Sequence, residues 1–335
     1  MLLRTDLQDS ELTSMPAFNV SRSTQIESDP ETVFKTFSDF ATWERWSPWL
    51  LAEKDATVTL KGDPTRVGGG FSWDGSVVGA GEMEHLELHP PSSGNSPGTM
   101  HAQLRFVRPW KSESKVDFEV KAGKDAEGRD VTNVRWDMAG SLPLVMFWMK
   151  NLMISLISMD YDRGLRMAKE LIETGEIASE TIVHGVTQVP SQRFVGLSGK
   201  TTLAEIGPAM EKTMGEVKKR IAEAGIATDG QWLSIYDDMN IKKQTLSYTS
   251  GMKLPEGAST PSGLSMTSVG AFTAMHVTHV GRYEHMGNAW FAAYQNLQAM
   301  KRKMASKLPG VEVYANSPED TPPQELRTEL YVPLK

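Results

Sequence analysis

Two glutamates near the end of the chain lie beside tyrosines in short strand-like runs. Glu312 and Tyr314 occur in GVEVY, and Glu329 and Tyr331 occur in TELYV, with aliphatic residues at alternate positions. Because successive side chains of a strand point to opposite faces, each run has one aliphatic face and one face with a carboxylate and a ring. Such a carboxylate attracts organic cations through its own charge and through the ring quadrupoles. These residue types therefore fit either ordinary solvent-facing glutamates or the lining of a binding site, and the elements around the strands decide between the two.

An internal repeat between residues 181 and 335 provides the elements that position these strands. Each unit reads as strand, amphipathic helix, turn and strand, and its last strand carries a tyrosine, Tyr236 in the first unit and Tyr314 in the second. The apolar stripes of the helices must pack on a sheet, and we expect them to cover the aliphatic strand faces. The opposite faces would then line a groove between the two units. An ordinary solvent-exposed or salt-bridged position is the alternative for each glutamate, above all for Glu329. The predicted groove residues are Trp232, Tyr236, Glu312, Tyr314, Glu329 and Tyr331.

Three segments of this half, FTAMHVTHVGRYEHMGNAW, GVEVYANSPED and RTELYVPLK, resemble the GyrI-like, or AraC-type effector-binding, domain. The resemblance covers residues 181–335 and implies a pseudo-twofold duplicated α+β domain. It also implies that the groove between the repeats holds small organic ligands, often cationic and aromatic. On this resemblance, Glu312 matches the buried glutamate of the family, and Tyr283 and Trp290 match aromatic residues near its ligand.

The first half of the chain has the pattern of an antiparallel sheet that ends in a long helix. A strand-like run, FNVSRSTQI, precedes a helix with Pro30 at its first position. About six short strand-like runs follow, separated by Gly, Pro and Ser, and a long helix extends from about Phe147 to Glu173 with a stop signal at Gly175. A curved sheet wrapped around the terminal helix would cover both apolar faces.

The segments STQIESDPETVFKTFSDFATWERWSPW, FSWDGSVVGAGEMEHLEL and DRGLRMAKELIE resemble the SRPBCC superfamily, of the START-related and polyketide cyclase type. The resemblance implies a helix-grip fold with an apolar cavity between the sheet and the long helix. We therefore predict an α+β chain with a flexible extension at 1–16, a helix-grip antiparallel sheet domain at 17–178 and the duplicated effector-binding domain at 181–335. Five tryptophans either line the cavity or pack as core, and packing is the commoner role: Trp43, Trp46, Trp49, Trp73 and Trp136.

The composition and the remaining motifs exclude several kinds of chemistry. The 335 residues include no cysteine, which excludes disulfides, thiolate nucleophiles and cysteine-ligated metals. The net charge of −7, without a basic block, argues against direct nucleic acid binding. His276 and His279 are three residues apart in a strand-like run and so face opposite ways, and we predict no metal site and no cofactor. GLSGKTT has Phe194 where a Walker loop needs its first glycine, which predicts a turn before a helix and no nucleotide site.

The apolar segment 142–159 is the candidate for a membrane span. It carries Lys150 and Asn151 at its middle and continues into a charged helix, so we interpret it as a buried amphipathic helix. The N-terminus lacks the pattern of a secretory signal. We therefore expect a cytoplasmic protein without a membrane span.

These observations predict a two-module small-molecule-binding protein that serves sensing or sequestration. The C-terminal groove would bind an amphipathic or cationic aromatic compound, and the N-terminal cavity would bind a hydrophobic ligand. The alternative is a hydrolase of electrophilic, cyclopropanoid-type molecules, because some GyrI-like proteins resemble such enzymes. In that case Glu312 would activate water, and Glu329 or Tyr283 would support proton transfer. The sequence leaves the ligand, any protein partner and the question of catalysis open.

Overall fold

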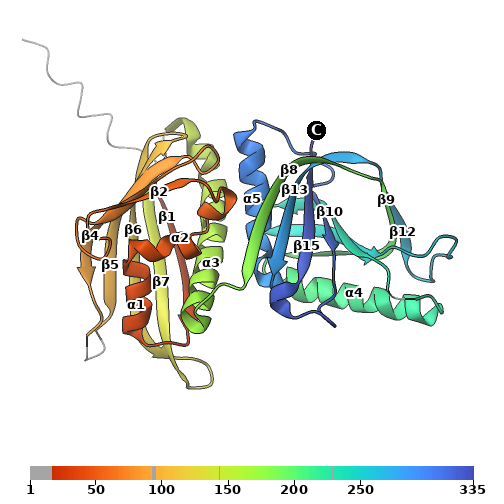
Figure 1. Cartoon of the computed structure of the whole chain (residues 1–335), viewed down its shortest axis with the longest axis horizontal. Coiled ribbons are helices and arrows are strands. Elements are labelled where there is room, and N and C mark those ends of the chain that lie inside the picture. Colours follow the sequence, from red (N-terminus) through yellow and green to blue (C-terminus); the bar gives the residue numbers. More distant parts are fainter. Residues whose placement is uncertain (1–16, 93–95, 143, 228) are drawn as a thin grey trace, which may run out of the picture. The chain divides into compact units, whose positions relative to one another are not determined.

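The computed structural model describes residues 17–92, 96–142, 144–227 and 229–335 (Figure 1). The chain divides into two compact units. Among the described residues, one comprises 17–48, 55–75 and 79–177, and the other comprises 49–54, 76–78 and 178–335. The extension predicted over residues 1–16 lies outside the described residues. Each unit contains an antiparallel sheet with few helices, which confirms the predicted α+β class.

The first unit is a seven-stranded antiparallel sheet with a long helix after the last strand, as the sequence predicts. The strand order across the sheet is β1-β7-β6-β5-β4-β3-β2. A 3₁₀ turn, Leu144–Met149, precedes the long helix, which therefore begins three residues later than expected. The elements are β1 (Ala17–Ile26), α1 (Pro30–Ser38), α2 (Trp43–Trp46), β2 (Thr57–Lys61), β3 (Gly70–Asp74), β4 (Ala80–His89), β5 (Gly98–Arg108), β6 (Ser112–Lys124), β7 (Asp130–Ser141) and α3 (Lys150–Thr174).

Local signals in the sequence set the ends of the helices. The side chain of Asp29 accepts a hydrogen bond from the Thr32 amide at 2.9 Å, which caps α1 just before Pro30. At the other end of the unit, α3 stops at Gly175, whose φ of 87° is left-handed and whose amide donates to the carbonyl of Leu171. Glycine adopts this conformation without the strain that a side chain would cause, which explains the predicted stop.

Aromatic rings fill the space between this sheet and α3. Tyr161 of α3 stacks on Trp136 of β7 with ring centroids 3.7 Å apart, and Trp136 stacks in turn on Phe118 of β6 at 4.9 Å. Trp43 and Trp46 of α2 contact the same cluster edge-on, and all five rings are buried. These tryptophans are therefore packed core, and at the level of Tyr161 rings occupy the place where the family resemblance implies a cavity.

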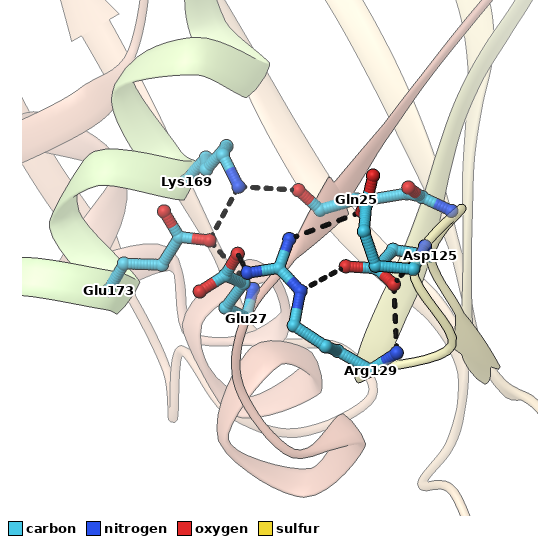
Figure 2. Close-up of polar contacts among 7 residues, drawn as sticks. Gln25, Glu27, Asp125, Arg129, Lys169 and Glu173 are labelled. Carbon is cyan, nitrogen blue, oxygen red and sulfur yellow. Dashed lines mark hydrogen bonds and ion pairs between the residues drawn. The ribbon is translucent and has the colours of Figure 1, made fainter.

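Polar contacts fasten the C-terminal end of α3 to the rim of the same sheet, as Figure 2 shows. Lys169 donates to the carbonyl of Gln25 at 2.8 Å and pairs with Glu173 at 2.5 Å. Glu173 also accepts the amide of Glu27 at 2.6 Å, and Arg129, beside the β6–β7 turn, reaches Glu27 at 3.3 Å. Exposed ion pairs contribute about 0–1 kcal/mol each, so this network orients the helix end while the aromatic core supplies most of the stability.

The second unit has the predicted duplication, with a pseudo-twofold axis between its two central strands. Its sheet has the order β12-β9-β11-β10-β14-β15-β13-β8, so β9-β11-β10 of the first repeat mirror β13-β15-β14 of the second. The first strand of each repeat crosses over: β8 pairs with β13, and β12 pairs with β9. The elements are β8 (Ser179–Val189), β9 (Gln192–Thr202), α4 (Ile206–Glu223), β10 (Trp232–Asn240), β11 (Thr245–Met252), β12 (Ser265–Val269), β13 (Phe272–Gly281), α5 (Met286–Ala299), β14 (Gly310–Tyr314) and β15 (Arg327–Pro333).

The helices cover the opposite face of the central strands from the one predicted. Tyr236 of β10 packs against Met210 of α4 and Trp290 of α5, so the aromatic face lies under the helices. We call this the helix face. The aliphatic residues of the same strands, such as Leu233 and Val311, instead pack with Phe194 and its neighbours on the other face. The residues that pack against them come from strands near both edges of the sheet, β9 and β12 on one side and β13 on the other. The strong curvature of the sheet brings these strands together (Figure 1).

Candidate functional site

The carboxylate of Glu312 is buried in the middle of the helix face, with 3% of the residue exposed. The indole N–H of Trp290 donates to Glu312 Oε1 at 2.7 Å, and the hydroxyl of Tyr314 donates to Oε2 at 2.8 Å. The Tyr314 hydroxyl also lies 3.3 Å from Ser234 Oγ. Glu312 is thus a recessed acid whose oxygens are held by side chains of aromatic residues.

The register of the two central strands and the packing of α5 create this arrangement. Ser234 of β10 lies directly opposite Glu312 of β14, and Tyr236 lies opposite Gly310. The Trp290 ring from α5 meets Tyr236 edge-on with centroids 5.0 Å apart. It also covers Gly310 so closely that a Cβ there would be 2.1 Å from the ring. Glycine at position 310 therefore allows the indole to reach the carboxylate.

Burial controls the protonation of the groups at this site. It raises the pKa of the Glu312 carboxyl above its ordinary value, and side-chain hydrogen bonds from Trp290, Tyr314 and Tyr236 oppose this rise without cancelling it. Burial, followed by the charge of Glu312, raises the pKa of Tyr283 to about 12. The same two causes raise the pKa of Tyr236 and Tyr314. These tyrosines therefore remain neutral donors at physiological pH.

Partly exposed aromatic rings lie between the buried carboxylate and the solvent. Tyr283, in the 3₁₀ turn before α5, is 37% exposed and meets Tyr314 edge-on at 5.9 Å. Trp290, Tyr294 and Tyr314 are half-buried. The rings close over Glu312 in this structure, so a ligand must displace some of them to reach it.

The strand register contradicts the prediction that Glu329 and Tyr331 share a groove with Glu312. Glu312 lies opposite Leu330, whereas Glu329 lies opposite Val313 and Tyr331 lies opposite Val311. Residues directly opposite each other share a face, so Glu329 and Tyr331 lie on the other face of the sheet. The alternation in β15 is as expected, but the register of β15 to β14 places Leu330, and not Glu329, on the face of Glu312.

Trp232 does lie on the helix face, opposite Tyr314. It packs with Val217 and Ile221 of α4 in a hydrophobic cluster. The structure therefore brings together Glu312, Tyr314, Tyr236, Trp290 and Tyr283 and places Trp232 in the adjoining core.

Two residues near Glu312 were missed by sequence reasoning. Tyr294 contacts the Trp290 ring at 5.8 Å, and the charge of Glu312, after burial, raises its pKa. The signal was available, because Tyr294 follows Trp290 by four residues and so shares its side of the helix. Ser234 also lies at the site, and it occupies in the first repeat the position that Glu312 occupies in the second.

The glycine-rich segment GLSGKTT is part of strand β9, so the turn predicted there is wrong. Gly199 lies opposite Tyr248, and a Cβ at this position would be 2.6 Å from the tyrosine ring. Glycine is needed here for packing beside that ring. The start of α4 follows four residues after the strand ends.

Residues 17–92, 96–142, 144–227 and 229–335 contain no helix with both the length and the apolar character that a membrane crossing requires.

Comparisons with known proteins give distant likenesses to solved structures. EcmrR in a complex with DNA is 13% identical, with 58% of this chain and 72% of that chain covered and a TM-score of 0.38. SAV2435 bound to tetraphenylphosphonium is 14% identical, with 45% and 92% covered and a TM-score of 0.35. A hydrolase from Listeria innocua is 12% identical, with 46% and 93% covered and a TM-score of 0.31. Likenesses of this size indicate neither a ligand nor a reaction.

No curated protein matches the chain. Two family models do, and they confirm both resemblances inferred from the sequence. One is described as polyketide cyclase / dehydrase and lipid transport, and the other as GyrI-like small molecule binding domain. The chain therefore joins a domain of the polyketide cyclase and lipid transport type, of the SRPBCC superfamily, at residues 17–173 to a GyrI-like small-molecule-binding domain at residues 185–335.

Proposed function

We propose that the GyrI-like domain binds a lipophilic organic cation, with Glu312 as its counter-ion and the surrounding rings as its walls. The observation that carries this proposal is the set of contacts around the carboxylate. Among the described residues, its hydrogen-bond partners are Trp290, Tyr314 and Tyr236, which are all neutral. The site thus offers a buried carboxyl group and aromatic surface, and a cationic ligand would supply the positive partner that the carboxylate lacks there.

The energetic cost of this arrangement supports a functional role. Burying an ionised carboxylate without a positive partner destabilises the folded chain, because hydrogen bonds replace only part of the lost hydration. Buried acids whose pKa is shifted occur preferentially at functional sites, where a ligand or a reaction can compensate for the cost of burial. A cation that enters the site would restore the charge balance and at the same time bury its own apolar surface.

The biological role that we propose is sensing or sequestration of such a compound. The match of residues 185–335 to a small-molecule-binding family supports binding. For the first unit, the match to a lipid-transport family supports a hydrophobic ligand. The rings stacked between Trp136 and Tyr161 would have to give way, or the ligand would have to bind elsewhere in that unit.

A matched pair of ions tests the charge requirement. Tetraphenylphosphonium and tetraphenylborate have nearly the same shape and opposite charges. At about 6 Å, the approach that the phenyl groups permit, a unit charge pair is worth about 2.8 kcal/mol in a protein-like medium. Titration calorimetry of the full chain should show that the cation binds and the anion does not. Glu312→Gln should weaken cation binding by up to about 100-fold, since each 1.4 kcal/mol is a factor of ten.

Glu325→Gln provides the control, because Glu325 is an exposed glutamate of the same unit and the variant changes the same chemical group at the surface. Equal binding of both ions, or a cation affinity unchanged in Glu312→Gln, would refute the proposal. Turnover of an electrophilic cyclopropane that depends on Glu312 would instead show that the site belongs to an enzyme.

A further inference from the structure

The other face of the same sheet carries a second group of polar residues, His184, His276 and Glu329. One ligand atom from each side chain can be chosen so that all three atoms lie within 4.8 Å of one another. We propose that these residues form a binding site for a divalent transition-metal ion of the zinc type. The site is separate from Glu312, since Glu329 and Glu312 lie on opposite faces of adjacent strands.

Three neighbouring strands bring the group together. His276 lies on β13, between Glu329 on β15 and His184 on β8. Pairing of β8 with β13 shifts by one residue at His184, because Gly185 pairs with His276 and Val183 pairs with Val277. Gly185 lies at this β-bulge with a φ of 91°, a left-handed conformation that glycine adopts without strain. The bulge leaves His184 unpaired in the ladder and turns its ring onto the face of His276.

His276 and Glu329 contact each other directly, and Thr278 links His184 to Glu329. His276 Nε2 lies 2.7 Å from Glu329 Oε2, and His184 Nε2 lies 2.8 Å from Thr278 Oγ1. The Thr278 hydroxyl donates to the same Glu329 oxygen at 2.6 Å. Zinc bonds of about 2.0–2.2 Å in tetrahedral geometry place ligand atoms about 3.3 Å apart, so small side-chain movements would accommodate an ion.

Surrounding residues orient the ligands as second-layer residues do in metal sites. Arg327 donates to Glu329 Oε1 at 2.7 Å, which leaves Oε2 to face the histidines. Tyr331 stacks on His276 with centroids 4.7 Å apart, and His184 stacks on its other side at 4.3 Å. The positive charge of Arg327 weakens the attraction for a cation, so an ion must gain its affinity from direct bonds to the imidazoles.

The ligand set and its exposure define the class of ion. Two imidazoles and one carboxylate suit zinc, cobalt, nickel or copper, whereas magnesium and calcium prefer oxygen ligands. His184 is exposed, and Glu329 and His276 are half-buried, so a fourth position faces solvent. Three protein ligands with an open position are the pattern of sites that bind a further ligand or an activated water.

Metal titration of the full chain, purified without a histidine tag, tests the site. Calorimetry with Zn²⁺ alone should give one ion per chain, and Co²⁺ should give the visible absorption bands of a protein-bound, low-symmetry site. His184→Ala and Glu329→Gln should each weaken Zn²⁺ binding at least about tenfold and abolish the cobalt bands.

His89→Ala is the matched control, because His89 is also exposed and lies 3.6 Å from a carboxylate, that of Glu87. It should bind Zn²⁺ as the wild type does. The cobalt spectrum of the wild-type chain gives an answer that does not depend on the folding of any variant. Absence of these bands, or Zn²⁺ affinities in His184→Ala and Glu329→Gln equal to that of His89→Ala, would overturn the proposal.

Discussion

The hydrogen bond from Trp290 to Glu312 offers a direct test of the claim that the buried carboxylate is charged. Trp290→Phe removes the N–H donor, which lies 2.7 Å from Glu312 Oε1, and keeps an aromatic ring over Gly310. The substitution also loses packing area. Combining it with Glu312→Gln in a double-mutant cycle separates the two effects, because the packing loss occurs in both backgrounds and cancels.

The expected coupling follows from the type of acceptor. A hydrogen bond to a charged group contributes about 1.5–3 kcal/mol, and one to a neutral group contributes about 0.5–1.5 kcal/mol. In the wild type the indole donates to a carboxylate, whereas in Glu312→Gln it donates to a neutral amide. Trp290→Phe should therefore cost about 1–1.5 kcal/mol more in the wild type than in Glu312→Gln.

Native-state hydrogen exchange of peptides that span β14 measures this cost locally, as the free energy of opening of the central strands. The measurement should be made at about pH 8, where the Glu312 carboxyl is deprotonated in the unfolded chain. At this pH its raised pKa in the folded chain has the largest effect on the free energy of unfolding. A coupling of zero at this pH would refute the reasoning, because the indole would then contact a group that behaves as neutral.

Three further predictions concern the same site. The raised pKa of Glu312 means that the folded chain binds more protons than the unfolded chain above the ordinary value of 4.5, so stability falls as the pH rises through this window. Glu312→Gln should remove that fall, which urea midpoints at about pH 4.5 and pH 8 would reveal; parallel wild-type and variant curves would contradict it. Gly310→Ala should lower the unfolding free energy by about 1–3 kcal/mol through its collision with Trp290, whereas Gly215→Ala, in open space on α4, should not destabilise the chain. Tyr283→Ala should weaken tetraphenylphosphonium binding about two- to fivefold, as expected for a partly exposed cation–ring contact. Unchanged binding would show that the ligand does not contact Tyr283 on its way to Glu312.

The sequence was informative where local signals decide the structure. The Asp29 cap, the glycine stop at 175, the succession of strands and helices along the first unit and the duplication in the second all follow from periodicity and turn residues. The two family resemblances rest on the same local patterns. Within the site, the recessed position of Glu312 and its aromatic neighbours Tyr314 and Trp290 were also anticipated.

What escaped prediction depends on long-range register. Alternation shows that Glu329 and Leu330 face opposite ways, but it does not show which of them shares a face with Glu312. It also does not show which face a helix covers when both faces are buried, as in β10 and β14. His184 and His276 are separated by 92 residues in the chain, and a bulge brings their rings together, so inspection of neighbouring histidines missed the pair.

The crossing of the first strands has a consequence for how the GyrI-like domain can be divided. Since β8 completes the sheet of the second repeat and β12 completes that of the first, neither half retains all of its strand partners when cut between β11 and β12. Each fragment would carry one orphaned strand and two bare edges, because the central pairing of β10 with β14 is also lost. Such edges recruit strands from other molecules. We expect the separate halves to reassemble with each other when co-expressed, and to form swapped pairs when expressed alone.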